Sequence, residues 1–119
     1  MSDTCRVRAT GALIAVVVVW SAAAPFIRFL DSPVWTDRNK ASLALMMLSE
    51  RRDPALLAAL RRDAIAPLAE MARWKSTGHA QPAFITLARI AGYSDETALT
   101  AWASGDRDTI IKAAEETRR

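Results

Sequence analysis

Few residues in this chain carry side chains that could do acid–base or metal chemistry. His79 is the only histidine and Cys5 the only cysteine among 119 residues. A general base needs a nucleophile or a fixed carboxylate beside it, and a zinc site needs several nitrogen or sulfur ligands. No spacing in the sequence supplies either set, so we interpret His79 as a polar residue of the turn at Gly78. We predict no catalytic residue, no metal site and no cofactor.

The charged residues do not indicate a nucleic-acid partner. The formal net charge is +3, from 16 basic and 13 acidic residues spread along the whole chain. Proteins that grip a phosphate backbone gather Lys and Arg into a dense patch, which this sequence lacks. The four glycines are isolated from one another, so no glycine-rich phosphate-binding loop is present either.

Two arginine pairs and two tryptophans are the candidates for contact with a partner protein. The pairs Arg51-Arg52 and Arg61-Arg62 could form a basic ridge, or each could complement the carbonyl end of the helix that it follows. Tryptophan near a helix end either packs at an edge of the fold or anchors a binding hot spot. The candidate partner-binding residues are Trp35, Arg51, Arg52, Arg61, Arg62 and Trp74.

The first 23 residues have the pattern of a signal peptide. Arg6 and Arg8 precede an unbroken apolar run over residues 12–20, and small residues follow at 21–24, so cleavage fits best between Ala23 and Ala24. The alternative is an uncleaved membrane anchor over residues 9–27. Its apolar part, residues 12–27, is 16 residues long, whereas a spanning helix needs about 20. The protein is thus expected to be exported, periplasmic or secreted, or else membrane-anchored.

The rest of the chain has apolar residues at helical spacing. We predict helices over about 37–49, 54–61 and 63–75, then from a start between 79 and 82 to about 91, and over about 95–104 and 106–114. The pair Asp53-Pro54 is a strong helix start, because aspartate caps free amides and proline suits the first position. Residues 24–36 contain two prolines and are expected to form an irregular lead-in before a helical domain over 37–119. No stretch of the mature chain alternates with period two, so the expected class is all-α.

A repeat organises these six helices. Shifting the chain by about 42 residues, a length typical of solenoid repeats, brings similar residues into register. Among the matched pairs are Ala41 with Ala83, Leu45 with Leu87, Asp53 with Asp95, Leu57 with Leu99 and Ala72 with Ala114. We therefore expect two units of three helices, with the same side of each unit facing the core.

The first helix of the first unit has more apolar surface than one neighbour needs. Leu43, Met46 and Met47 lie outside its inward stripe. Such a surface needs a cover, and we expect residues 25–35 to fold back over it as a lid. The alternative is that a second molecule or a partner covers it.

Two stretches carry a family resemblance. The series Arg38-x-x-Ala41-x-x-Ala44-Leu45-x-x-Leu48, with Asp53-Pro54-Ala55-Leu56-Leu57-x-x-Leu60 after it, resembles the paired helices of HEAT-type repeats. The series Leu87-Ala88-x-Ile90-Ala91-Gly92-x-x-Asp95-x-x-Ala98-Leu99 resembles the same pattern again, and three helices per unit is similar to an armadillo repeat.

The resemblance covers residues 37–117 and implies a short right-handed α-solenoid, HEAT/armadillo-like, whose surface binds other proteins and which has no shared catalytic set. The expected function is that of an exported, non-enzymatic helical-repeat protein mediating protein–protein interaction in the cell envelope. The alternative is a membrane-tethered structural subunit of a larger complex. Neither the partner nor the oligomeric state follows from the sequence.

Overall fold

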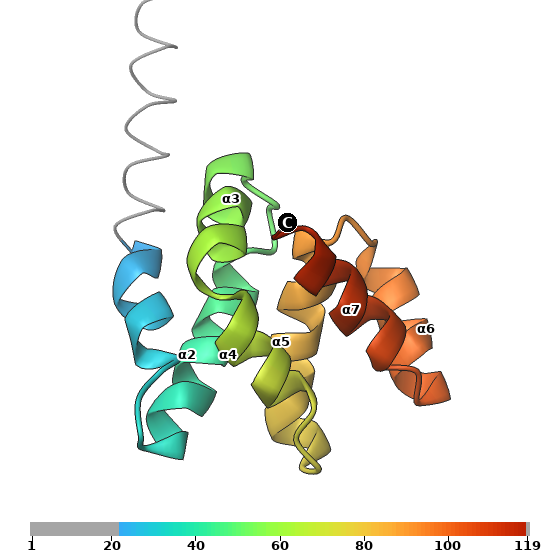
Figure 1. The fold of residues 1–119 in the computed structure, drawn as a ribbon, viewed down its shortest axis with the longest axis horizontal. Helices are drawn as coiled ribbons and strands as arrows, with labels where there is room; N and C mark the ends of the chain where they lie inside the picture. The colour runs from blue at the N-terminus through green and yellow to red at the C-terminus, as the bar shows by residue number, and fades with distance from the viewer. Residues whose placement is uncertain (1–21, 119) are drawn as a thin grey trace, which may run out of the picture.

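The computed structural model describes residues 22–118, and every regular element among them is a helix. The predicted all-α class is therefore confirmed for this part of the chain. Cys5 and nearly all of the predicted signal segment lie outside the described residues. After a helix over residues 22–29, the elements in chain order are α2 (Trp35–Leu48), α3 (Pro54–Asp63), α4 (Ile65–Ala72), α5 (Thr77–Ile90), α6 (Asp95–Ser104) and α7 (Asp108–Glu116) (Figure 1).

Local sequence signals account for several helix ends. Asp53 caps α3, its Oδ1 accepting from the backbone amides of Ala55 at 2.9 Å and Leu56 at 3.2 Å. Ser94 caps α6 by accepting from the amide of Thr97. Gly105 ends α6 with a φ of 82°, a left-handed conformation that side-chain-bearing residues rarely adopt.

Other helix ends differ from their expected positions. The helix α5 begins at Thr77, ahead of Pro82, which lies inside it. Proline removes one backbone donor there, and burial of its ring offsets part of that loss. The helix α7 begins at Asp108, two residues after the predicted start, and Asp106 accepts from the amide of Thr109 ahead of it.

The helix α5 is the centre of the molecule, in contact with α2, α3, α4, α6 and α7. It runs in the same direction as α2 (Figure 1). Rings from the first turns of the two helices meet, and Arg89 near the end of α5 bonds to the carbonyl of Met46 near the end of α2. Leu45 and Leu87 are fully buried, as the repeat predicted.

Burial agrees at some of the positions matched by the 42-residue shift. Ala41 with Ala83 and Ala72 with Ala114 are buried at both positions. Others differ: Leu99 was expected to face inward and is 47% exposed, and Trp102 is only partly buried where the matched Leu60 is fully buried. Only Ala98 of α6 is buried, so α6 turns the preceding position toward α5 and leaves Leu99 in solvent.

The expectation of an irregular lead-in was wrong for residues 24–29, which belong to the helix over residues 22–29. Ala23, Ile27 and Leu30 share one face at helical spacing and belong to the core. Burial of that stripe outweighs the helix-breaking tendency of Pro25. Ile27 and Leu30 thus belong to the core, although the lead-in that contains them was expected only to cover the domain.

The expected lid is realised only in part. Residues 22–29 lie beside α2, where Phe26 and Phe29 line a shallow pocket with Lys40 and Ala41. This contact covers the Ala41 flank of α2. Leu43 and Met47 stay 45% and 65% exposed, so the lead-in leaves the outward face of α2 open.

Candidate functional site

An aromatic surface occupies the end of the molecule where α2 and α5 begin. Trp35 is the first residue of α2, and its ring lies 5.0 Å from that of His79 at an angle of 58°. His79 is in turn fixed by Ser76, whose Oγ lies 2.9 Å from Nδ1. Trp35 remains 54% exposed although it has this neighbour. Its ring is therefore held in place and still open to solvent.

Arg38 joins Trp74 to the same surface. Its guanidinium carbon lies 5.2 Å from the centre of the Trp74 ring, within cation–π range. Its two terminal nitrogens bond to Glu70 at 3.3 Å and 3.2 Å, while its buried Nε has no hydrogen-bond partner. Since Trp35 and Arg38 are one turn apart on α2, the structure brings both predicted tryptophans together. We call Trp35, Arg38, Glu70, Trp74 and His79 the aromatic surface.

Arg107 holds the backbone at Trp74 from the α7 side. Its Nη1 donates to the carbonyls of Trp74 at 2.8 Å and Ala72 at 3.1 Å, which end α4. Its guanidinium also lies 4.1 Å over the ring of Trp102. A polar pocket of ≈ 480 Å³ opens beside it, lined by residues 73–75 and 105–108. The turn that carries Trp74 is thus fixed by cations on two sides.

The predicted arginine pairs do not form one basic ridge. Arg52 donates to the carbonyl of Tyr93 at 2.6 Å and to Asp95 at 3.0 Å, and Arg61 donates to the carbonyl of Ile90 at 3.0 Å. These two arginines therefore serve the carboxyl end of α5, about 20 Å from the aromatic surface by the length of that helix.

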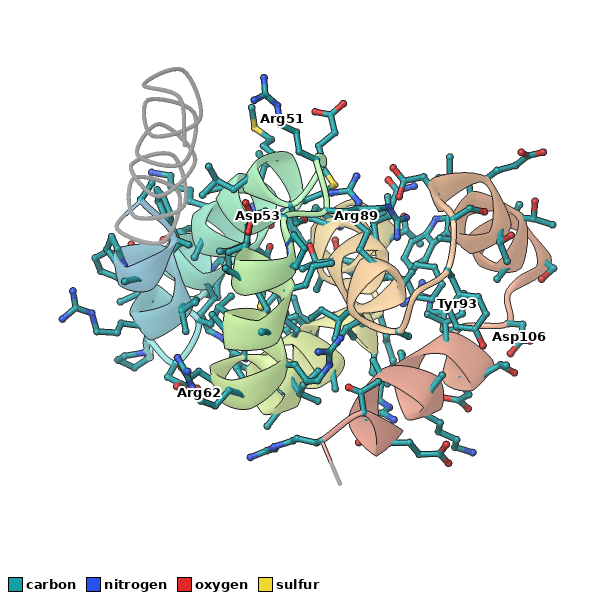
Figure 2. All side chains as sticks on the ribbon, turned by 90° about the horizontal axis from the view of Figure 1, so that it is seen from above. Arg51, Asp53, Arg62, Arg89, Tyr93 and Asp106 are labelled. Atoms are coloured by element: carbon teal, nitrogen blue, oxygen red, sulfur yellow. The ribbon has the colours of Figure 1, made fainter. Side chains whose placement is uncertain are left out.

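The other member of each pair, Arg51 and Arg62, lies at the surface. Arg62 bonds to its neighbour Asp63 through Nε and Nη2, both at 3.0 Å. Arg51 is exposed and points away from the body of the protein (Figure 2). Each pair thus divides into one structural arginine and one at the surface.

Arg89 and Asp95 are the most buried ionic contact at that end. Arg89 is 6% exposed and donates to both carboxylate oxygens of Asp95, at 3.0 Å from Nε and 2.9 Å from Nη2. Its Nη1 also donates to Ser49 Oγ at 2.9 Å and to the carbonyl of Met46. The hydrogen bonds from Arg89, with the positive charges of Arg89 and Arg52, lower the pKa of Asp95 below its ordinary value against the opposing effect of burial. This cluster ties the α2–α3 turn to the α5–α6 turn.

Sequence reasoning missed three arginines that make the long-range contacts described above. They are Arg38, Arg89 and Arg107. One signal was available for Arg89. It stands between Leu87 and Ile90 in a stripe that must be buried, and an aspartate follows six residues later. A charge inside an apolar stripe needs a partner, so that spacing predicts an ion pair across the turn.

The described residues 22–118 also bear on metal binding and on membrane crossing. These residues contain no cluster of three or more His, Cys, Asp or Glu side chains placed to hold a metal ion. None of the helices formed within the same range is long and apolar enough to span a membrane. No protein-family model, curated protein or solved structure matches the chain.

Proposed function

We propose that this chain is a short right-handed α-solenoid, HEAT/armadillo-like, with two three-helix units. The parallel course of α2 and α5 supports this, because corresponding helices of stacked units run the same way. Contacts across the two units also recur near the repeat length: Arg73 pairs with Glu115, which lies 42 residues later, and Arg52 with Asp95, which lies 43 later. A solenoid of this kind presents a surface for other proteins.

We further propose that the protein is exported and non-enzymatic, and that it binds another protein of the cell envelope through the aromatic surface. The observation that carries this is the state of Trp35, which is half-exposed although His79 fixes its ring. A tryptophan already held in one orientation loses little conformational freedom when a partner covers it. Tryptophan and arginine are also the residue types enriched at binding hot spots.

The rest of the surface suits a protein partner. Arg38 and Glu70 pair with each other beside the ring of Trp74, so polar groups adjoin the aromatic side chains. An apolar centre with polar groups around it is typical of protein interfaces. The arginines Arg51 and Arg62 lie away from this centre, and we assign them no role in the contact.

Site-specific photo-crosslinking tests the proposal. A benzophenone amino acid replaces Trp35 in one variant and Leu99 in a control variant, since both native side chains are about half exposed. We expect a discrete crosslinked protein in living cells from position 35 and none from position 99. Trp35→Ala should weaken binding of the protein identified in this way by about 1 to 4 kcal/mol, the range for a hot-spot residue. Equal crosslinking at both positions would contradict the proposal.

The burial of Ile27 bears on the choice between export and anchoring. Because Ala23 and Ile27 both pack in the core, at 0% and 8% exposure, neither can also lie in a bilayer. The apolar stretch left for an anchor is then residues 9–22, which is 14 residues. At a rise of 1.5 Å that stretch covers about 21 Å, less than the about 30 Å of a hydrocarbon core. This supports a cleaved signal peptide.

A membrane-tethered structural subunit is the second candidate, and the position of Ala23 favours it. The predicted cleavage point, between Ala23 and Ala24, falls inside the helix over residues 22–29, and Ala23 is fully buried. Cleavage there would remove a core residue from the finished domain. Intact mass of the protein isolated from cells separates the two candidates: a chain that begins at Ala24 supports export, and one that retains Met1 or Ser2 in the membrane fraction supports the tether.

A further inference from the structure

The outward face of α2 is apolar at its centre and has no cover among the described residues. Lys40, Leu43 and Met47 follow one another at spacings of three and four, so they form one stripe along the helix. This stripe lies opposite the buried stripe of Ala41 and Leu45. Neither the helix over residues 22–29 nor α5 closes over it, as the exposure of Leu43 and Met47 shows.

A further exposed apolar side chain lies beside this stripe. Among the large hydrophobic side chains exposed in the described chain, Leu43 and Met47 belong to the stripe and Trp35 belongs to the aromatic surface. Phe29 is the one next to the stripe. It is 50% exposed and lines the shallow pocket with Lys40, so it widens the apolar strip beside α2. A patch of this kind marks an interaction surface in a soluble domain.

The charges at the two ends of the stripe are self-complementary. Lys40 precedes Leu43 by three residues, and Glu50 follows Met47 by three. Both charged side chains are exposed, and neither takes part in an ion pair within residues 22–118. If two copies of the helix align antiparallel, Leu43 of each copy meets Met47 of the other, and Lys40 of each meets Glu50 of the other. A two-fold axis repeats every contact, as an isologous dimer requires.

We propose that the occupant of this face is a second copy of the same chain, and that the protein forms an antiparallel two-fold dimer through α2. The apolar pair Leu43 and Met47 forms the centre of the interface, with Phe29 at its flank and the pairs of Lys40 with Glu50 at its rim. A parallel arrangement is disfavoured because it would set Lys40 against Lys40 and Glu50 against Glu50. This inference does not rest on the proposed function, since the aromatic surface lies on the α5 side of α2.

Disulfide crosslinking of the full chain in cells tests the geometry. Two differently tagged copies are co-expressed, one carrying Leu43→Cys and the other Met47→Cys, both with Cys5→Ser, and a mild oxidant is added. We expect a disulfide-linked pair of the two tags. The matched control places cysteine at Leu99 in both copies, because that side chain is exposed to a similar extent, 47% against 45% for Leu43; no linked pair is expected from it.

A charge exchange tests the rim. Lys40→Glu alone and Glu50→Lys alone each place like charges together twice per dimer, so each should lower the crosslinking yield about three- to tenfold. The combined Lys40→Glu, Glu50→Lys variant restores opposite charges and should recover the yield. Circular dichroism of each variant confirms that the monomer stays folded, as expected for changes at exposed positions.

Three results would overturn the dimer. The first is a Leu43-to-Leu43 yield above the Leu43-to-Met47 yield, which would indicate parallel association. The second is failure of the combined variant to recover. The third is absence of any linked pair while the chain binds vesicles of phosphatidylglycerol, and loses that binding with Leu43→Glu, which would assign the face to lipid. Trp35→Ala should leave the crosslinking unchanged, which separates this face from the aromatic surface.

Discussion

Arg89 near the end of α5 donates two hydrogen bonds to Asp95 at the start of α6, with both nitrogen-to-oxygen distances near 3 Å. The two residues are separated by a turn, so the pair fixes the angle at which α6 leaves α5. Arg89 also bonds to Ser49 beyond the end of α2. The guanidinium of Arg89 therefore connects α5, the start of α6 and the turn after α2, and its loss should weaken the packing of all three.

Removing the acidic partner should destabilise the fold. In Asp95→Asn the nearly buried guanidinium of Arg89 loses its counter-ion, and we expect a loss of about 1 to 3 kcal/mol in the free energy of unfolding. Urea denaturation measures it. Glu96→Gln is the matched control, because Glu96 is exposed on the same helical turn and should change stability by less than about 0.5 kcal/mol. Equal stability of the two variants would mean that the pair contributes little.

The same pair predicts a pH dependence. The pKa of Asp95 is lowered in the folded protein, first by its hydrogen bonds from Arg89. A carboxyl with a lowered folded-state pKa contributes stability above its unfolded pKa of about 4, and that contribution disappears as the pH falls through the folded-state value. The stability difference between wild type and Asp95→Asn should therefore be constant from about pH 7 to 5 and shrink below about pH 4. A difference that grows in acid would reverse the assigned sign.

The third prediction concerns how much the Asp53 side-chain cap of α3 contributes to stability. Asp53 accepts from two backbone amides in the first turn of that helix. Asp53→Ala should lower the free energy of unfolding by about 1 kcal/mol, the usual cost of a lost side-chain cap. Thermal denaturation followed by circular dichroism measures the change. Asp53→Asn keeps an acceptor oxygen and should lose much less, and an equal loss in both variants would point to the charge instead of the cap.

The two equivalent core leucines should be similarly sensitive. Leu45→Ala and Leu87→Ala each empty a fully buried site and should cost about 2 to 5 kcal/mol. Leu99→Ala removes the same atoms from a half-exposed position and serves as the control, with an expected change below about 1 kcal/mol. Chemical denaturation of the three variants measures the contrast. Core and control variants of equal stability would contradict the burial on which the repeat rests.

The helices and the core could be predicted because they depend on local pattern. Helical spacing placed Leu45 and Leu87 in the core, and the Asp53-Pro54 signal located the start of α3. The lead-in could not be predicted in this way, since its two prolines argue against a helix and the outcome depends on burial of Ile27 and Leu30 against the rest of the fold. Tertiary burial overrode local preference there.

The candidate site was predictable only in part, for the same reason. The sequence marked Trp35 and Trp74 as edge residues, but their meeting depends on Arg38, which is an ordinary helix residue until α4 lies beside it. Arg52 and Arg61 read as helix-end cations. They do bond at a helix end, but it is the end of α5. The carbonyl that Arg61 binds belongs to Ile90, 29 residues later in the chain. Long-range partners of this kind have no local sequence signal.

Arginine hydrogen bonds are concentrated at the carboxyl end of α5, and their distribution should decide where local unfolding begins. Arrays of stacked helices commonly fray from their ends, because each unit contacts only its neighbours. Here Arg52, Arg61 and Arg89 bond α3 and the turn before it to the end of α5 and the turn after it. On the other side, Arg107, just before α7, bonds to the end of α4, and within α7 itself the described residues show one exposed ion pair to that part of the chain, Arg73 with Glu115. Opening should therefore begin at α7, and amide protons in the last turns of α5 should be the slowest to exchange with solvent. A protease that samples these brief openings would cut first near Gly105, and the fragment that it leaves would still hold the aromatic surface.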